Sequence, residues 1–206
     1  MKIAIIGSGN VGGALAQKWI TAGHTVLVGA RFPLSDKNLK LATIIGEDRF
    51  ASIENAVKQA EVILIATPAP ATVEVVKSLG DTTGKIIIDS MNIVMGRGPQ
   101  GYTHTTDAIL ANTQTRDVVK CFNTTGFNNM LNPVYGNTAL DMFVAGDSPT
   151  GVQAATQLAK DAGFAECYHI GGNDKFELME QFAWFWINLA MFRGQGREIG
   201  FKLLKR

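Results

Sequence analysis

The sequence predicts an α/β protein with a doubly wound parallel sheet, and three observations lead to this fold class. Short runs of branched apolar residues alternate with segments of helical periodicity along the chain. Two of these runs, residues 62–66 and 86–88, contain no polar residue, as expected of strands buried on both faces of a parallel sheet. A glycine-rich turn at residues 7–13 joins the first strand to the first helix, which is typical of a βαβ unit.

The expected elements alternate in chain order. Val11, Leu15, Trp19 and Ala22 recur at helical spacing, and Gly23 ends that helix. The predicted strands cover residues 2–6, 25–29, 49–51, 62–66, 86–88, 118–122, 141–145 and 166–170. The predicted helices cover residues 10–22, 35–46, 52–60, 72–79, 106–112, 149–162 and about 174–192.

Length and composition predict one soluble domain over residues 1–206, in which 174–206 is a C-terminal helix packing on the domain or on a dimer partner. A formal net charge of +1 favours neither nucleic acid nor an anionic membrane as partner. We expect no signal peptide, because the apolar run near the N-terminus is short, and no membrane span, because the longest apolar stretch, residues 182–192, is too short to cross a bilayer. Cys121 and Cys167, which form no CxxC pattern, are interpreted as buried free thiols in the cytoplasm rather than as a disulfide.

Residues 7–12 fit the pattern G-x-G-x-x-G between a strand and a helix, the context of a Rossmann dinucleotide site. Gly7 permits a tight turn, Gly9 lets main-chain amides approach a pyrophosphate, and Gly12 lets the helix pack closely on the strand. The alternative is a glycine turn without a ligand. The predicted cofactor contacts are Gly7, Ser8, Gly9, Asn10, Val11 and Gly12.

Arg31, 19 residues beyond Gly12, indicates NADP(H) rather than NAD(H) as the cofactor. An NAD-preferring site places Asp or Glu here to accept the ribose 2′-hydroxyl, and neither is present. The guanidinium of Arg31 can instead form a forked contact with a 2′-phosphate. The alternative is a solvated loop charge.

Three expected strand ends carry polar or turn-forming residues, and ligands in open α/β sheets lie outside such carboxyl ends. Thr67 and Pro68 follow the fourth strand, Asn92 follows the fifth, and Asn123 follows the sixth. We expect Thr67, Asn92 and Asn123 to hold the ribose and carboxamide of the nicotinamide half. Ordinary turn chemistry is the alternative for each residue taken alone.

The sequence presents no acid–base or metal-binding pattern. His24, His104 and His169 have no evident carboxylate partner at useful spacing, and there is neither a Tyr-x-x-x-Lys pattern nor a metal-ligand cluster. Catalytic residues therefore stay unassigned. Hydride exchange with a flavin-like ring mainly needs orientation and exclusion of water. The absence of an acid–base pattern is compatible with such a reaction. The glycine-containing loop at residues 90–103 is either a lid or a passive connector.

Four segments carry a family resemblance: GSGNVGGALAQKWITAGHTVLVGAR, ATPAP, KCFNTTG and NLAMFRGQGREIGFKLL. All four resemble the NADP oxidoreductases that depend on the 5-deazaflavin coenzyme, and the first three also resemble the cytoplasmic NADPH-binding domain of membrane metalloreductases. The resemblance implies NADPH along the sheet edge, a partner ring stacked on the nicotinamide, and a homodimer. Around residues 121–127 the chain is closer to the metalloreductase pattern, so deazaflavin, FMN and FAD stay open as the second carrier.

The leading hypothesis is an NADPH-dependent oxidoreductase that transfers a hydride between NADP(H) and a flavin-type carrier, a small molecule. The alternatives are a non-catalytic NADPH sensor and a small imine or carbonyl reductase. The final helix is apolar nearly all round, and we interpret it as core plus dimer interface rather than as a flavin platform built on Trp184 or Trp186. Its large apolar residues are Phe182, Trp184, Phe185, Trp186, Leu189 and Phe192.

Overall fold

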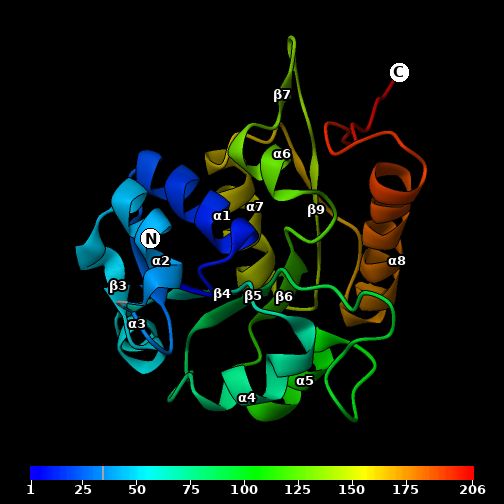
Figure 1. Ribbon diagram of the computed structural model, residues 1–206. Coiled ribbons are helices and arrows are strands. Elements are labelled where there is room, and N and C mark those ends of the chain that lie inside the picture. The colour runs from blue at the N-terminus through cyan, green and yellow to red at the C-terminus, as the bar shows by residue number, and fades with distance from the viewer. Residues whose placement is uncertain (34) are drawn as a thin grey trace.

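The computed structural model describes residues 1–33 and 35–206, and these form a mostly parallel eight-stranded sheet with helices on both faces (Figure 1). The strand order β10-β9-β6-β5-β4-β1-β2-β3 places the reversal of strand order between β1 and β4, where doubly wound folds bind ligands. The strands are β1 Lys2–Ile6, β2 Thr25–Gly29, β3 Phe50–Ala51, β4 Val62–Ile65, β5 Ile86–Asp89, β6 Val118–Cys121, β9 Met142–Ala145 and β10 Cys167–His169.

The predicted fold class is confirmed, but one neighbouring strand pair runs against the prediction of a parallel sheet. β9 pairs with β6 in the antiparallel sense. The connection between them holds the short α6 (Phe127–Leu131) and the hairpin of β7 (Val134–Tyr135) and β8 (Thr138–Ala139), none of which was predicted. Because this connection contains no full crossover helix, the chain re-enters the sheet from the carboxyl edge of β6.

Helices cover the two faces of the sheet as two layers (Figure 1). Ser52 and Ser148 cap α3 and α7 by accepting the amides of Asn55 and Gly151, so local sequence sets these two starts. One layer contains α1 Asn10–Thr21, α2 Asp36–Ile45 and α7 Pro149–Asp161, and the other contains α3 Ile53–Gln59, α4 Thr72–Lys77 and α5 Thr105–Asn112.

The core is divided between the two faces of the sheet by the alternation of side chains along each strand. In β1, Ile3 and Ile5 pack with the α1 side, including Trp19, whereas Ala4 and Ile6 pack on the α3 side. Trp19 is fully buried, and its Nε1 donates to Leu158 O at 2.9 Å. Helix α1 is therefore fixed to α7 as well as to the sheet.

The C-terminal region differs from the expected helix over residues 174–206. Helix α8 (Phe176–Ile187) continues as a π-helical turn at Asn188–Phe192, and residues 193–206 are not helical. Gly194 and Gly196 adopt φ of 71° and 72°, a conformation that ends a helix. Beyond them the chain folds back, and Asp141 accepts the Leu203 amide and pairs with Lys202. No helix in the described part of the chain is both long and apolar enough to cross a membrane.

Candidate functional site

The glycine loop, residues 7–12, lies at the carboxyl end of β1, and its glycines occupy tight positions. Gly7 has φ of +115°, and a Cβ there would lie 2.4 Å from Ala66 O. A Cβ on Gly12 would lie 2.0 Å from Gly7 O. At Gly9, by contrast, an added Cβ would meet no atom within 4 Å. Two glycines are thus required by the fold itself, and the third borders open space.

The N-terminus of α1 provides main-chain donors beside this open space. The bond from Gly13 N to Gly9 O, 2.8 Å long, is the first of the helix. The amides of Asn10, Val11 and Gly12 precede it and therefore have no acceptor within the helix. The first turn carries no acidic residue, so the positive end of the helix dipole is not neutralised locally. This arrangement suits an anion such as a pyrophosphate.

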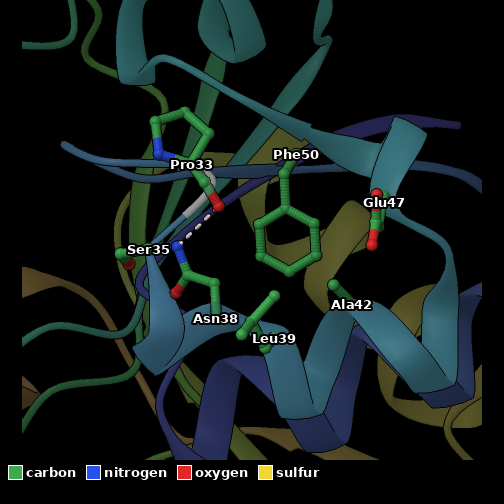
Figure 2. Close-up of a pocket in the computed structure, with 7 residues that line it drawn as sticks. All are labelled: Pro33, Ser35, Asn38, Leu39, Ala42, Glu47 and Phe50. Atoms are coloured by element: carbon green, nitrogen blue, oxygen red, sulfur yellow. Dashed lines mark hydrogen bonds between the residues drawn. The ribbon is translucent and has the colours of Figure 1, made fainter.

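Arg31 lies just beyond β2 on the surface. Its Nη1 lies 3.1 Å from Oε1 of Glu74 on α4, and the two side chains are 73% and 69% exposed. The segment after it is held to α2, because Asn38 Nδ2 donates to the carbonyl oxygens of Phe32 and Pro33 at 2.9 and 3.0 Å. Figure 2 shows Asn38 directed at Pro33. Both residues line a hollow of about 250 Å³. Because both side chains of its ion pair with Glu74 are exposed, Arg31 can exchange this carboxylate for another anion.

Thr67 and Pro68 follow β4, next to the glycine loop. Thr67 Oγ1 donates to Met91 Sδ at 3.4 Å, and its methyl group lies 3.2 Å from the position of a Cβ on Gly7. Pro68 is exposed and precedes a 3₁₀ turn at Ala69–Ala71. Neither residue lines the pocket described below.

Asn92 and Asn123, which sequence reasoning placed at one edge, form a reciprocal amide pair. Asn92 Nδ2 donates to Asn123 O at 2.8 Å, and Asn123 Nδ2 donates to Asn92 Oδ1 at 2.9 Å. Asn123 Nδ2 also donates to Met179 O at 3.1 Å, which fixes the orientation of this amide. Its Oδ1 is buried and has no hydrogen-bond partner in the described residues. A buried acceptor of this kind is costly unless a ligand or water donates to it.

Phe122 turns the chain so that Asn123 enters the site. It has φ of +62° and is fully buried, with its ring packed edge-on to Trp19 at 5.5 Å between centroids. A bulky residue with positive φ is strained, and such residues cluster at functional sites. The surrounding core imposes this turn.

The α8 pocket, a cavity of about 320 Å³, lies between the glycine loop, the amide pair and α8. Trp186 forms part of its wall, and its Nε1 donates to Ile199 O at 2.8 Å. Arg197 lies over the rings of Phe127 and Trp186, 5.2 and 5.7 Å from their centroids. The complete lining is Asn10, Val11, Asn92, Asn123, Thr125, Gly126, Phe127, Ala183, Trp186, Ile187, Met191 and Arg197.

The described residues that line the α8 pocket include no carboxylate, imidazole, lysine or tyrosine. Two of the three histidines, His24 and His104, do have carboxylate partners, contrary to the sequence prediction, whereas His169 Nε2 lies 3.1 Å from Gly146 O. His24 Nε2 lies 2.9 Å from Asp161 Oδ2, and His104 Nδ1 lies 2.8 Å from Asp107 Oδ2. The first pair joins residues 137 positions apart, which spacing does not reveal. Neither pair belongs to the lining, so the pocket itself contains hydrogen-bonding groups and one cation but no general base.

Beside the pocket lies a buried ion cluster of Asp89, Lys120 and Glu180, which the sequence analysis missed. Lys120 Nζ lies 3.0 Å from Asp89 Oδ2 and 2.8 Å from Glu180 Oε1. Asp89 also accepts the hydroxyls of Thr105 and Thr106. The available signal was a lone charge within the apolar run Val118–Cys121.

Two pKa values in this region are raised, for different reasons. Burial alone would lower the pKa of Lys120, but the Asp89 and Glu180 carboxylates raise it above the ordinary lysine value. Burial, together with the hydrogen bond that its thiol makes with Cys167, raises the pKa of the Cys121 thiol well above its usual range. Both cysteines are free and buried, as predicted, and the raised pKa of Cys121 means that this thiol is not an activated thiolate.

Comparison with known proteins finds one family profile that is similar to the N-terminal part of the chain. The sequence profile of the family described as "NADP oxidoreductase coenzyme F420-dependent" matches residues 2–93, somewhat less than half of the chain. This match confirms the predicted resemblance and the predicted class, an NADP-dependent oxidoreductase.

Solved structures share the fold. A protein from Arthrobacter sp. FB24, named as a putative F420-dependent NADP reductase, has a TM-score of 0.82 at 23% identity, with 100% of both chains covered. A hypothetical protein from Sinorhizobium meliloti has a TM-score of 0.72 at 23% identity, with 84% of this chain and 85% of that chain covered. A reductive aminase from Aspergillus terreus, solved with NADPH4, cyclohexanone and allyl amine, has a TM-score of 0.66 at 18% identity; 94% of this chain matches 62% of that one.

Proposed function

We propose that the chain is a single NADP(H)-binding domain that transfers a hydride between NADP(H) and a flavin-type carrier, namely deazaflavin, FMN or FAD. The observation that carries the proposal is the α8 pocket, which joins the start of α1 to the unpaired acceptor of Asn123. The glycine loop would hold the pyrophosphate, and Arg31 the 2′-phosphate. The nicotinamide would then reach the amide pair.

The nicotinamide end of the site fits a carboxamide. A carboxamide NH₂ group can donate to Asn123 Oδ1, which satisfies the buried acceptor. Bound NADPH supplies the hydride. The protein then has to orient the ring and exclude water, because the reaction needs no proton transfer from a pocket side chain.

The outer part of the α8 pocket would receive the carrier ring. Trp186, Ile187 and Met191 give this wall an apolar surface suited to a flat heterocycle, and Arg197 adds a cation at its rim. The cation would attract carbonyl oxygens or phosphates of the carrier. Trp186 faces this pocket, whereas Trp184 is 42% exposed on the outer side of α8.

An imine or carbonyl reductase is the second candidate, favoured by the similarity of fold to the reductive aminase. The lining of the α8 pocket weighs against a carbonyl substrate, since an alkoxide product needs a proton donor and the described lining offers no acid. The NADPH sensor differs from both candidates by binding without turnover.

To test these candidate functions, the protein is mixed with NADPH and, in separate reactions, with deazaflavin, FMN, FAD, a cyclic imine or a small ketone. The absorbance of the reduced nicotinamide is followed over time. Turnover with a flavin-type carrier alone is the expected result. Turnover with the imine or ketone alone would favour the reductase, and tight binding without any turnover would favour the sensor.

The outward side of α8 would form a homodimer interface in the cytoplasm, where free thiols persist. Phe185 and Phe192 are 52% and 60% exposed there and continue the apolar surface of Trp184. Sedimentation analysis of Phe185→Glu should show monomers where the unmodified chain gives dimers. A monomeric unmodified chain would refute the interface and leave the proposed hydride transfer untouched.

A further inference from the structure

The ion cluster holds the main chain on both sides of Asn92. On one side, its lysine donates to Met91 O at 2.9 Å and its aspartate accepts from Met91 N at 2.9 Å. On the other side, Glu180 Oε2 accepts from Ile93 N at 2.8 Å. These bonds fix the backbone of a segment that has no regular secondary structure at this point.

Asn92 transmits this restraint into the α8 pocket. Its side chain exchanges two hydrogen bonds with Asn123, and this exchange holds the unpaired Oδ1 of Asn123 in place. Asn123 is only 3% exposed, so water offers it little competition. A continuous series of contacts therefore runs from the ion cluster through the amide pair to the pocket.

The cluster also places charge beside the pocket. Two carboxylates face one ammonium, and the side chains of Lys120, Asp89 and Glu180 are 0%, 0% and 12% exposed. With both carboxylates ionised, one negative charge is left in surplus where water screens it poorly. Glu180 precedes Ala183 and Ile187 by three and seven residues on α8, so all three share one helix face, and the latter two line the pocket.

We infer that Lys120 and Glu180 are positioning residues for the nicotinamide and that the surplus negative charge of their cluster favours its oxidised form. The inference rests on the proposed function, because it requires NADP(H) in the α8 pocket. The oxidised ring carries a positive charge and the reduced ring is neutral, whereas the carboxamide is common to both. A purely geometric change therefore affects both affinities alike, and a change of charge alters their ratio.

Two substitutions of Glu180 separate geometry from charge. Glu180→Asp keeps the charge but retracts it from Ile93 N, and Glu180→Gln keeps the length but removes the charge. In calorimetric titrations, Glu180→Asp should weaken the binding of NADP⁺ and NADPH alike, whereas Glu180→Gln should weaken mainly the binding of NADP⁺. Only Glu180→Gln should raise the ratio of Kd for NADP⁺ to Kd for NADPH, by about three- to tenfold.

Asp117→Asn is the matched control. Asp117 precedes β6 at the amino end of the strand and accepts the hydroxyls of Ser148 and Thr150, so its replacement removes a charge far from the pocket. Neither affinity should change. An unaltered ratio in Glu180→Gln, or an equal shift in Glu180→Asp, would overturn the inference. Failure of the unmodified chain to bind either nucleotide would instead refute the proposed function.

If Glu180→Gln does not fold, Asn92→Asp provides the second test. This change adds a negative charge at the pocket and keeps the acceptor that Asn123 Nδ2 needs. The ratio of Kd for NADP⁺ to Kd for NADPH should then fall below that of the unmodified chain. A ratio that stays the same or rises would contradict the electrostatic part of the inference.

Discussion

The two ends of the candidate site are built in different ways. At the glycine-loop end, main-chain atoms form the site: the glycine loop folds against Ala66, and α1 offers its free amides. At the α8 end, side chains form it, and they come mainly from the segments that follow β5 and β6 and from α8. Asn123, Glu180 and Trp186 are each held by partners distant in sequence.

Because of this difference, the two ends of the site should be sensitive to different substitutions. A main-chain site tolerates most side-chain changes but fails where a Cβ enters the loop. A side-chain site depends on a buried network in which the loss of one member leaves the others unpaired. Substitutions at the two ends should therefore differ in whether they act on stability, on nucleotide binding, or on both.

The largest effect is expected for Lys120→Met. This change leaves the Asp89 and Glu180 carboxylates facing each other without a cation, which costs about 3–5 kcal/mol in the free energy of unfolding. Because the folded pKa of Lys120 is raised, its contribution is complete below the ordinary lysine pKa and is lost only as pH rises through the folded value. Urea unfolding should therefore give the same loss between about pH 6 and pH 9.

Lys160→Met is the comparison for this prediction. Lys160 Nζ lies 3.1 Å from Glu166 Oε2, but both side chains are about half exposed. Exposed pairs of this kind contribute about 0–1 kcal/mol, so the unfolding curve should hardly move. Equal losses for the two lysines would show that the ion cluster is not structurally important.

The strand–turn–helix geometry of the glycine loop could be predicted because its signals are local. Gly7, Gly9 and Gly12 follow a strand and open a helix, so chain order alone places them. Arg31 follows from the spacing to the second strand end in the same way. The boundaries of α2 could also be predicted from the sequence, since Ser35 and Gly46 flank the helix as cap residues.

The α8 end was only half predictable because it depends on tertiary contacts. Asn92 and Asn123 were placed at one edge, but their mutual orientation depends on the positive φ of Phe122, which no local pattern requires. Glu180 pairs with Lys120 from 60 positions away, and nothing in either segment indicates its partner. The strand at residues 141–145 was predicted, but its antiparallel pairing with β6 was not, because this pairing is also a tertiary contact.

The next effect distinguishes two glycines of one loop. Gly12→Ala places a Cβ against Gly7 O and should cost about 1–3 kcal/mol of stability together with NADPH binding. Gly9 has φ of −72° and open space around the position of a Cβ, so Gly9→Ala should change the free energy of unfolding by no more than about 0.5 kcal/mol. Its NADPH affinity should nevertheless fall at least about tenfold, because the methyl group occupies the pyrophosphate position. Unimpaired NADPH binding by Gly9→Ala in titrations would argue against the assigned phosphate position.

Arg31→Ala should separate the two nucleotides without affecting the fold. A charge-assisted hydrogen bond contributes about 1.5–3 kcal/mol, so NADPH affinity should drop about 10- to 150-fold. NADH, which lacks the 2′-phosphate, should keep its affinity to within about twofold. Fluorescence titration with both nucleotides measures the two affinities. Equal losses of NADPH and NADH affinity would show that Arg31 does not bind the 2′-phosphate.

The smallest effect is expected for Glu74→Gln, which acts through Arg31. Glu74 and a bound 2′-phosphate compete for one guanidinium, and the exposed pair is worth only about 0–1 kcal/mol. Removing the carboxylate should raise NADPH affinity up to about fivefold, leave NADH unchanged, and lose its effect at high salt. In an Arg31→Ala background the gain should vanish, because the two substitutions share one interaction. A gain that persists there would mean that Glu74 repels the nucleotide directly rather than by occupying Arg31.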